Sequence, residues 1–133
     1  MTKLKKLPVS KQTFQDFPEQ GYLYVDKTRL IHRLITEKNA CFLSRPRRFG
    51  KSLLVSTMEA IFQGKKELFK HLWIEESDYK WPVYPVIRLD MSKVEFYTMD
   101  QLRSGLINRL RESSSQYGIE IEENTLPGEY LNQ

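Results

Sequence analysis

The chain has 133 residues, of which 40% are hydrophobic and 29% are charged, and its formal net charge is +4. This length predicts about one domain with a modest core, and the composition is typical of a globular protein rather than a disordered one. No apolar run approaches the roughly 20 residues of a membrane span, and the first residues lack the apolar core of a signal peptide. The sequence therefore predicts a cytoplasmic protein with no membrane partner.

The N-terminal residues 1–12 are basic and are predicted to form a solvated tail, which leaves residues 13–133 for the domain. A turn is expected at Gln20–Gly21, followed by a short extended piece at 22–25. A helix should follow, begin at a cap formed by Asp26 or Thr28, and end near Asn39. Its expected buried face consists of Leu30, Ile31, Leu34 and Ile35.

The apolar run at 40–44, "ACFLS", has the length of a strand and leads directly into a basic loop. Cys41, the single cysteine, is expected in the core of this strand, where it would not act as a nucleophile. The next helix should start near Gly50 and stop at Gly64, because apolar residues recur between them at helical spacing. The order strand, loop, helix is the frame of a phosphate-binding turn.

The loop carries half of the G-x-x-x-x-G-K-[ST] pattern. Gly50, Lys51 and Ser52 match its end, but Arg45 stands where the first glycine is expected, and Pro46 follows. A helix that begins near Gly50 would direct its N–H groups and its positive dipole end toward the loop, as an anion requires. The alternative is a chance tripeptide within a solvated basic loop.

Each loop residue has an expected role if the cofactor is Mg²⁺ and ATP. Lys51 should reach the β- and γ-phosphates as the catalytic residue, and Ser52 should ligate the metal. Backbone N–H groups of residues 47–52 should surround the phosphates, whereas Pro46 has no N–H group to contribute. Arg47 or Arg48 should add a guanidinium, or should instead stay exposed or pair with acids elsewhere. The expected cofactor contacts are Arg47, Arg48, Phe49, Gly50, Lys51, Ser52, Leu53 and Asp26.

Beyond this helix, the residues 65–74 form a short amphipathic stretch whose expected core residues are Leu68, Phe69, Leu72 and Trp73. Residues 86–90 are expected to form a second strand. Thr98 and Gln101 form a possible capping box for a last helix that stops at Gly118. Because strands and helices alternate, the sequence predicts an α/β fold with a parallel sheet flanked by helices.

Four segments resemble those of the AAA-ATPase-like family of bacterial and archaeal proteins. They are "YVDKT" at 24–28, "FLSRPRRFGKSLL" at 42–54, "FQGKKELFKHLWI" at 62–74 and "YPVIRLDMS" at 84–92. They occur in the family's order, and the likeness runs over nearly the whole chain. The resemblance implies that the arginine in place of the first glycine is the family's own variant of the Walker A loop.

The resemblance also implies a partial P-loop NTPase fold. In this family the segment before the loop strand commonly lies over the adenine, so Asp26 either borders the base or caps its helix. The metal-associated acids come on a later strand, so the chain should stop before Walker B, as the N-terminal part of a longer ATPase or as a truncated product. Asp90 is accordingly either a catalytic acid or a strand-end residue that bonds to nearby backbone.

Three functions are compatible with these features. The chain is expected to be the nucleotide-binding part of an ATPase, inactive by itself because phosphoryl transfer needs several separated groups. It would otherwise be a nucleotide-dependent interaction module without turnover, or a basic nucleic-acid-binding fragment. Its expected partners are a nucleotide and either a protein or the missing C-terminal domains. His32 and His71 have no metal-ligand spacing.

Overall fold

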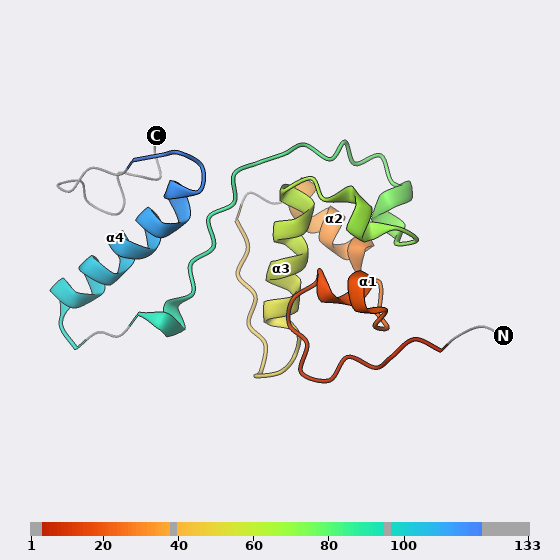
Figure 1. Cartoon of the computed structure of the whole chain (residues 1–133), viewed down its shortest axis with the longest axis horizontal. Helices are drawn as coiled ribbons and strands as arrows, with labels where there is room; N and C mark the ends of the chain where they lie inside the picture. The colour runs from red at the N-terminus through yellow and green to blue at the C-terminus, as the bar shows by residue number, and fades with distance from the viewer. Residues whose placement is uncertain (1–3, 38–39, 95–96, 121–133) are drawn as a thin grey trace. The chain divides into compact units, whose positions relative to one another are not determined.

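The computed structural model describes residues 4–37, 40–94 and 97–120, in two units, Met1–Tyr84 and Pro85–Gln133 (Figure 1). The first unit contains the helices α1 (Asp16–Gln20), α2 (Thr28–Glu37) and α3 (Lys51–Phe62) and the 3-10 turns η1 (Lys66–Phe69) and η2 (Trp73–Glu76). The second contains the 3-10 turn η3 (Met91–Lys93) and the helix α4 (Met99–Ser115). All three long helices were expected, while the short α1 was not.

The prediction of an α/β fold with a parallel sheet is wrong. Within the described ranges the residues 40–44 and 86–90 form no strand, and the only β-type backbone pairing is an isolated parallel bridge between Lys6 and Tyr22. Figure 1 shows both segments as long traces without arrows. A strand needs a neighbour for its N–H and C=O groups, and local sequence supplies only the extended backbone, not the neighbour.

The burial expected for the run at 40–44 is also wrong. Cys41 is exposed, and the side chain of Phe42 is 93% exposed. Because no sheet forms here, the apolar residues of this run have no layer to pack against. The structure thus leaves a hydrophobic segment at the surface immediately before the basic loop.

The core of the first unit lies where α2, α3 and η1–η2 meet. Its buried cluster consists of Phe14, Ile31, Ala60, Ile61, Phe69 and Ile74. The rings of Phe14 and Phe69 stack with centroids 4.5 Å apart, which joins the N-terminal segment to η1. In the stretch 65–74, Phe69 is buried as predicted, whereas Trp73, also expected in the core, is 41% exposed and Ile74 is fully buried. The η1 and η2 turns determine which side of this stretch faces inward.

The second unit is built around α4. Thr98 Oγ1 accepts a hydrogen bond from Gln101 N–H (3.2 Å) and Gln101 Oε1 accepts one from Thr98 N–H (3.2 Å), so the predicted capping box is confirmed. Leu110 and Ser114 are buried, and a Cβ on Gly105 would lie 2.6 Å from Val94 Cγ1. Asp90 Oδ1 accepts hydrogen bonds from the N–H and the hydroxyl of Ser92. It therefore bonds to nearby backbone, which was the structural alternative to a catalytic role.

Candidate phosphate-binding loop

Gly50 sets the geometry between the basic loop and α3. Its φ of 77° and ψ of 17° lie in the left-handed region, where only glycine is free of steric cost, and α3 starts at the next residue. The Gly50 carbonyl accepts the first helical hydrogen bond, from Leu54 N–H, at 2.9 Å. Glycine provides no side-chain cap, and the N–H groups of a first helical turn have no intrahelical partners. The N-terminal end of α3 therefore presents open donors and a partial positive charge.

The side chain of Lys51 bends back toward the loop that precedes it. Its Nζ donates a hydrogen bond to the carbonyl oxygen of Arg45, at 2.7 Å. This bond spans six residues and closes the loop into a ring with the ammonium group on its rim. Arg48, inside the ring, has a φ of 66°, so a second loop residue adopts the left-handed conformation that side chains normally avoid.

A cavity of about 450 Å³ lies beside the start of α3. One wall comes from the loop and the helix, with Arg48, Gly50, Lys51, Ser52 and Leu53. The opposite wall comes from the N-terminal segment, with Pro8, Ser10, Lys11 and Gln12. Three cations and two serines thus border one space at the positive end of a helix. We call it the loop cavity.

A second cavity, of about 470 Å³, also borders Gly50 and is more apolar. Its lining includes Leu23, Val25, Leu43, Phe49, Leu53 and Leu54, with Tyr24 and Thr57 among the polar members. Burial raises the pKa of Tyr24, the hydrogen bond with the Thr57 side chain acts against this rise, and the charge of Asp26 adds to it. Tyr24 therefore stays a neutral phenol at physiological pH. We call this space the apolar cavity.

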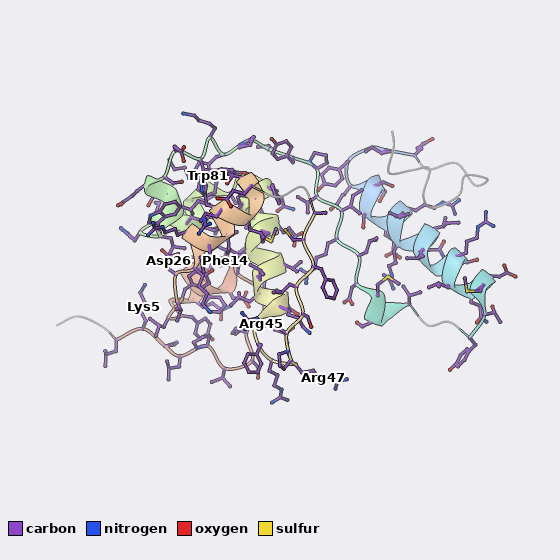
Figure 2. All side chains as sticks on the ribbon, turned by 180° about the vertical axis from the view of Figure 1, so that it is seen from behind. Lys5, Phe14, Asp26, Arg45, Arg47 and Trp81 are labelled. Carbon is purple, nitrogen blue, oxygen red and sulfur yellow. The ribbon has the colours of Figure 1, made fainter. Side chains whose placement is uncertain are left out.

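The structure brings most of the predicted cofactor contacts together. Arg48, Lys51 and Ser52 line the loop cavity, Phe49 lines the apolar cavity, and Gly50 and Leu53 line both. Arg47 belongs to neither lining and lies at the outer edge of the loop, farther out than Arg45 (Figure 2). The loop is exposed throughout, from residue 41 to 52.

The carboxylate of Asp26 already forms hydrogen bonds with nearby residues of the fold. It accepts hydrogen bonds from the N–H and the hydroxyl of Thr28, at 2.8 and 2.7 Å, and from Trp73 N–H at 2.7 Å. Burial acts to raise the pKa of Asp26, but these hydrogen bonds outweigh it, so the net pKa lies below the ordinary value. Asp26 itself lines neither cavity, whereas its neighbours Val25 and Lys27 line the apolar cavity.

The N-terminal segment was not identified as part of the site from the sequence. Residues 8–12 form a wall of the loop cavity because Ser56, on α3, holds them: its Oγ accepts from Phe14 N–H (2.8 Å) and donates to the Gln12 carbonyl (3.1 Å). The available signal was the pair Phe14 and Phe17, both of which are buried. Two large aromatic residues directly after a basic stretch indicate an anchored segment rather than a free one.

The comparisons with known proteins agree with the resemblance of the four segments. The model of the AAA-ATPase-like family, described as predicted AAA-ATPase, matches residues 8–133. An uncharacterised protein in the vnfD 5′ region of Azotobacter chroococcum mcd 1 is 34% identical over 129 residues, which cover 86% of this chain and 25% of the relative. The chain therefore spans about a quarter of the length of that relative. No solved structure matches the chain.

Two absences among the described residues concern the chain and its candidate site. None of the helices there combines the length and the apolar character of a membrane span. Across the same residues no three His, Cys, Asp or Glu side chains gather in a way that would hold a metal ion. On the match of its family model, the chain belongs to the AAA-ATPase-like family, described as predicted AAA-ATPase.

Proposed function

We propose that the chain binds ATP with Mg²⁺ through a variant Walker A loop, as part of an AAA-like ATPase. The observation that carries this proposal is the left-handed turn at Gly50. It places Lys51, Ser52 and the open N–H groups of α3 on the wall of one cavity of about 450 Å³. Anions bind at such helix ends because N–H groups and the dipole both favour negative charge.

The roles in this proposal follow the chemistry of each side chain. The ammonium of Lys51 binds the β- and γ-phosphates, and the hydroxyl of Ser52 ligates Mg²⁺. The guanidinium of Arg48, which lines the same cavity, adds a charge-assisted contact to phosphate. Arg47, at the outer edge of the loop, remains a predicted contact. Magnesium would supply charge neutralisation between the phosphates, and the chain's own contribution is binding and orientation.

ATP binding at Lys51 requires that its hydrogen bond to the Arg45 carbonyl breaks. In the structure the ammonium donates to a neutral carbonyl oxygen at 2.7 Å. A phosphate oxygen is the stronger acceptor because both partners then carry charge. We therefore expect ATP to replace the Arg45 carbonyl, which opens the ring of the loop.

The apolar cavity is the proposed place for the adenine base. Its aliphatic and aromatic walls suit a flat heterocycle, and its volume of about 470 Å³ lies in the range of small-ligand sites. Leu53 and Gly50 are shared with the loop cavity, so one nucleotide can occupy both spaces. In this arrangement Asp26 acts by holding the segment with Tyr24 and Val25 in position rather than by contacting the base.

A titration with a fluorescent ATP analogue, with and without Mg²⁺, tests the proposal. We expect Lys51→Ala to reduce affinity by at least tenfold, since it removes hydrogen bonds to a charged group, with an unchanged circular dichroism spectrum. Lys66→Ala is the matched control, because Lys66 is exposed on η1 and lines neither cavity. Equal binding by the two variants would refute the role of the loop.

The same titration tests the nucleic-acid alternative. A nucleic-acid binder would prefer a single-stranded oligonucleotide, lose affinity steeply with salt and be indifferent to ATP. A non-hydrolysing interaction module would bind ATP as the proposal states, so phosphate release by a longer form of the protein, rather than this titration, distinguishes it from an ATPase.

A further inference from the structure

The N-terminal segment 8–12 faces the loop across both cavities. Pro8 and Lys11 line the loop cavity and the apolar cavity alike, together with Gly50 and Leu53. Residues shared by two adjacent spaces lie where the spaces meet. Lys11 is the only one of the four with a charged side chain, so it is the cation at the junction.

The position of this segment is determined by the helix that carries Lys51. Ser56 on α3 is buried and bonds to both sides of the segment, to Phe14 N–H at 2.8 Å and to the Gln12 carbonyl at 3.1 Å. Phe14, three residues after Lys11, is 1% exposed. The wall that carries Lys11 and the wall that carries Lys51 are therefore attached to one rigid element.

The present contacts of Lys11 are weak ones. Its Nζ lies 3.6 Å from Asp16 Oδ2, with both side chains 31% exposed, and 5.5 Å from the ring centroid of Tyr22. A half-exposed ion pair at this distance contributes little, because water screens it. The ammonium is thus available to a stronger acceptor.

We propose that Lys11 is a second cationic contact of the nucleotide and binds its α-phosphate. This inference rests on the proposed function. With the base in the apolar cavity and the outer phosphates beside Lys51, the α-phosphate is the group that lies at the junction of the two spaces. Lys11 then closes the site from the wall opposite the loop, and Asp16 is the acceptor that it leaves.

The test compares Lys11→Gln, Asp16→Asn and the control Lys6→Gln in titrations with adenosine, AMP, ADP and ATP. Because the α-phosphate is common to the three nucleotides, we expect Lys11→Gln to weaken AMP, ADP and ATP alike, by about tenfold, and to leave adenosine unchanged. Asp16→Asn removes the competing acceptor and should strengthen all three by about two- to threefold. Lys6 is exposed and lines neither cavity, so Lys6→Gln should match the wild type.

The outcomes separate this inference from the proposed function. If the wild type binds ATP and Lys11→Gln binds it equally well, the role of Lys11 is refuted and the proposed function stands. If Lys11→Gln loses ATP affinity but keeps that for AMP, the assignment to the α-phosphate is wrong. A purely structural Lys11–Asp16 pair predicts that both variants lower the melting temperature and neither raises affinity, which would also overturn the inference. A wild type without any nucleotide binding refutes the proposed function itself.

Discussion

Two polar residues of the "YVDKT" segment connect parts of the chain that are far apart in sequence. Thr28 is fully buried, donates its hydroxyl to Asp26 Oδ1 and accepts from Ile74 N–H at 3.1 Å. Asp26 Oδ2 accepts from Trp73 N–H at 2.7 Å. Two hydrogen bonds thereby join the start of α2 to η2, and the bond between Thr28 and Asp26 orients the two acceptors. This arrangement explains why a charged residue is useful here even without a ligand.

Replacing Asp26 by asparagine should destabilise the fold. The Nδ2 group of Asn would face Trp73 N–H, two donors without an acceptor, and the charged acceptor of the Thr28 bonds would be lost. Because Asp26 is exposed and water can reach these donors, we expect a decrease of about 0.5–1.5 kcal/mol in the free energy of unfolding near neutral pH, measured by urea denaturation. The control is Glu76→Gln, an exposed acid on η2, which should change it by less than about 0.5 kcal/mol.

Asp26 should also make the free energy of unfolding depend on pH. Because the pKa of Asp26 is lowered in the fold from its ordinary value of 3.8, the charged form is favoured when folded, and its stabilising contribution is present above 3.8. The contribution is lost as the pH falls from 3.8 through the lowered pKa of the folded state. The difference between wild type and Asp26→Asn should therefore stay constant from about pH 7 to about pH 5 and shrink as the pH falls below the ordinary value of 3.8. A difference that grows with acid would contradict the assignment.

At the scale of elements, the junction between the loop and α3 depends on one backbone conformation. Gly50 and Gly21 both have positive φ, 77° and 69°, and a Cβ on either would meet no atom within 4 Å. Alanine at each position should thus cost about 1–2 kcal/mol from backbone strain alone. The two glycines have different locations. Gly21 is the C-cap of α1, whereas Gly50 lines both cavities.

This pair provides a matched test of the loop. We expect Gly50→Ala and Gly21→Ala to lower the urea midpoint by similar amounts, while only Gly50→Ala weakens binding of the fluorescent ATP analogue. The physical reason is that strain at Gly50 redirects the N–H groups of α3 and the Lys51 side chain. An equal loss of affinity in Gly21→Ala would mean that general destabilisation, not the loop, controls binding.

At the scale of the whole molecule, both cavities and all proposed cofactor contacts belong to the unit Met1–Tyr84. That unit supplies cations, N–H donors and two serines to the loop cavity. Phosphoryl transfer needs in addition groups that position the attacking water and hold the metal on its other side.

We therefore expect this chain to bind Mg·ATP without sustained turnover. Phosphate release should not exceed that of the Lys51→Ala variant in a continuous phosphate assay with excess Mg·ATP. The comparison removes contaminating activity, because both proteins would carry it. Steady release that depends on Lys51 would show that the chain is a complete catalyst and would overturn this expectation.

The sequence by itself determined the elements whose signals lie within a few residues. The capping box of Thr98 and Gln101, the helical spacing of α2 and α3 and the glycine turn before Lys51 all depend on hydrogen bonds between near neighbours. The match of four segments determined the family in the same way. Such signals can be read without knowledge of the rest of the fold.

Tertiary structure decided which distant segments meet. The run at 40–44 has the sequence of a strand, but whether it pairs depends on a second segment that local sequence does not specify, and here none of the described residues pairs with it. Likewise, Ile74 rather than Trp73 is buried because η1 and η2 reorient the chain. Lys11 lines both cavities in a segment that Ser56 holds through hydrogen bonds to Gln12 and Phe14, at sequence separations of 44 and 42 residues. Long-range contacts of this kind carry no periodic signal, so only the fold could place Lys11 opposite the loop.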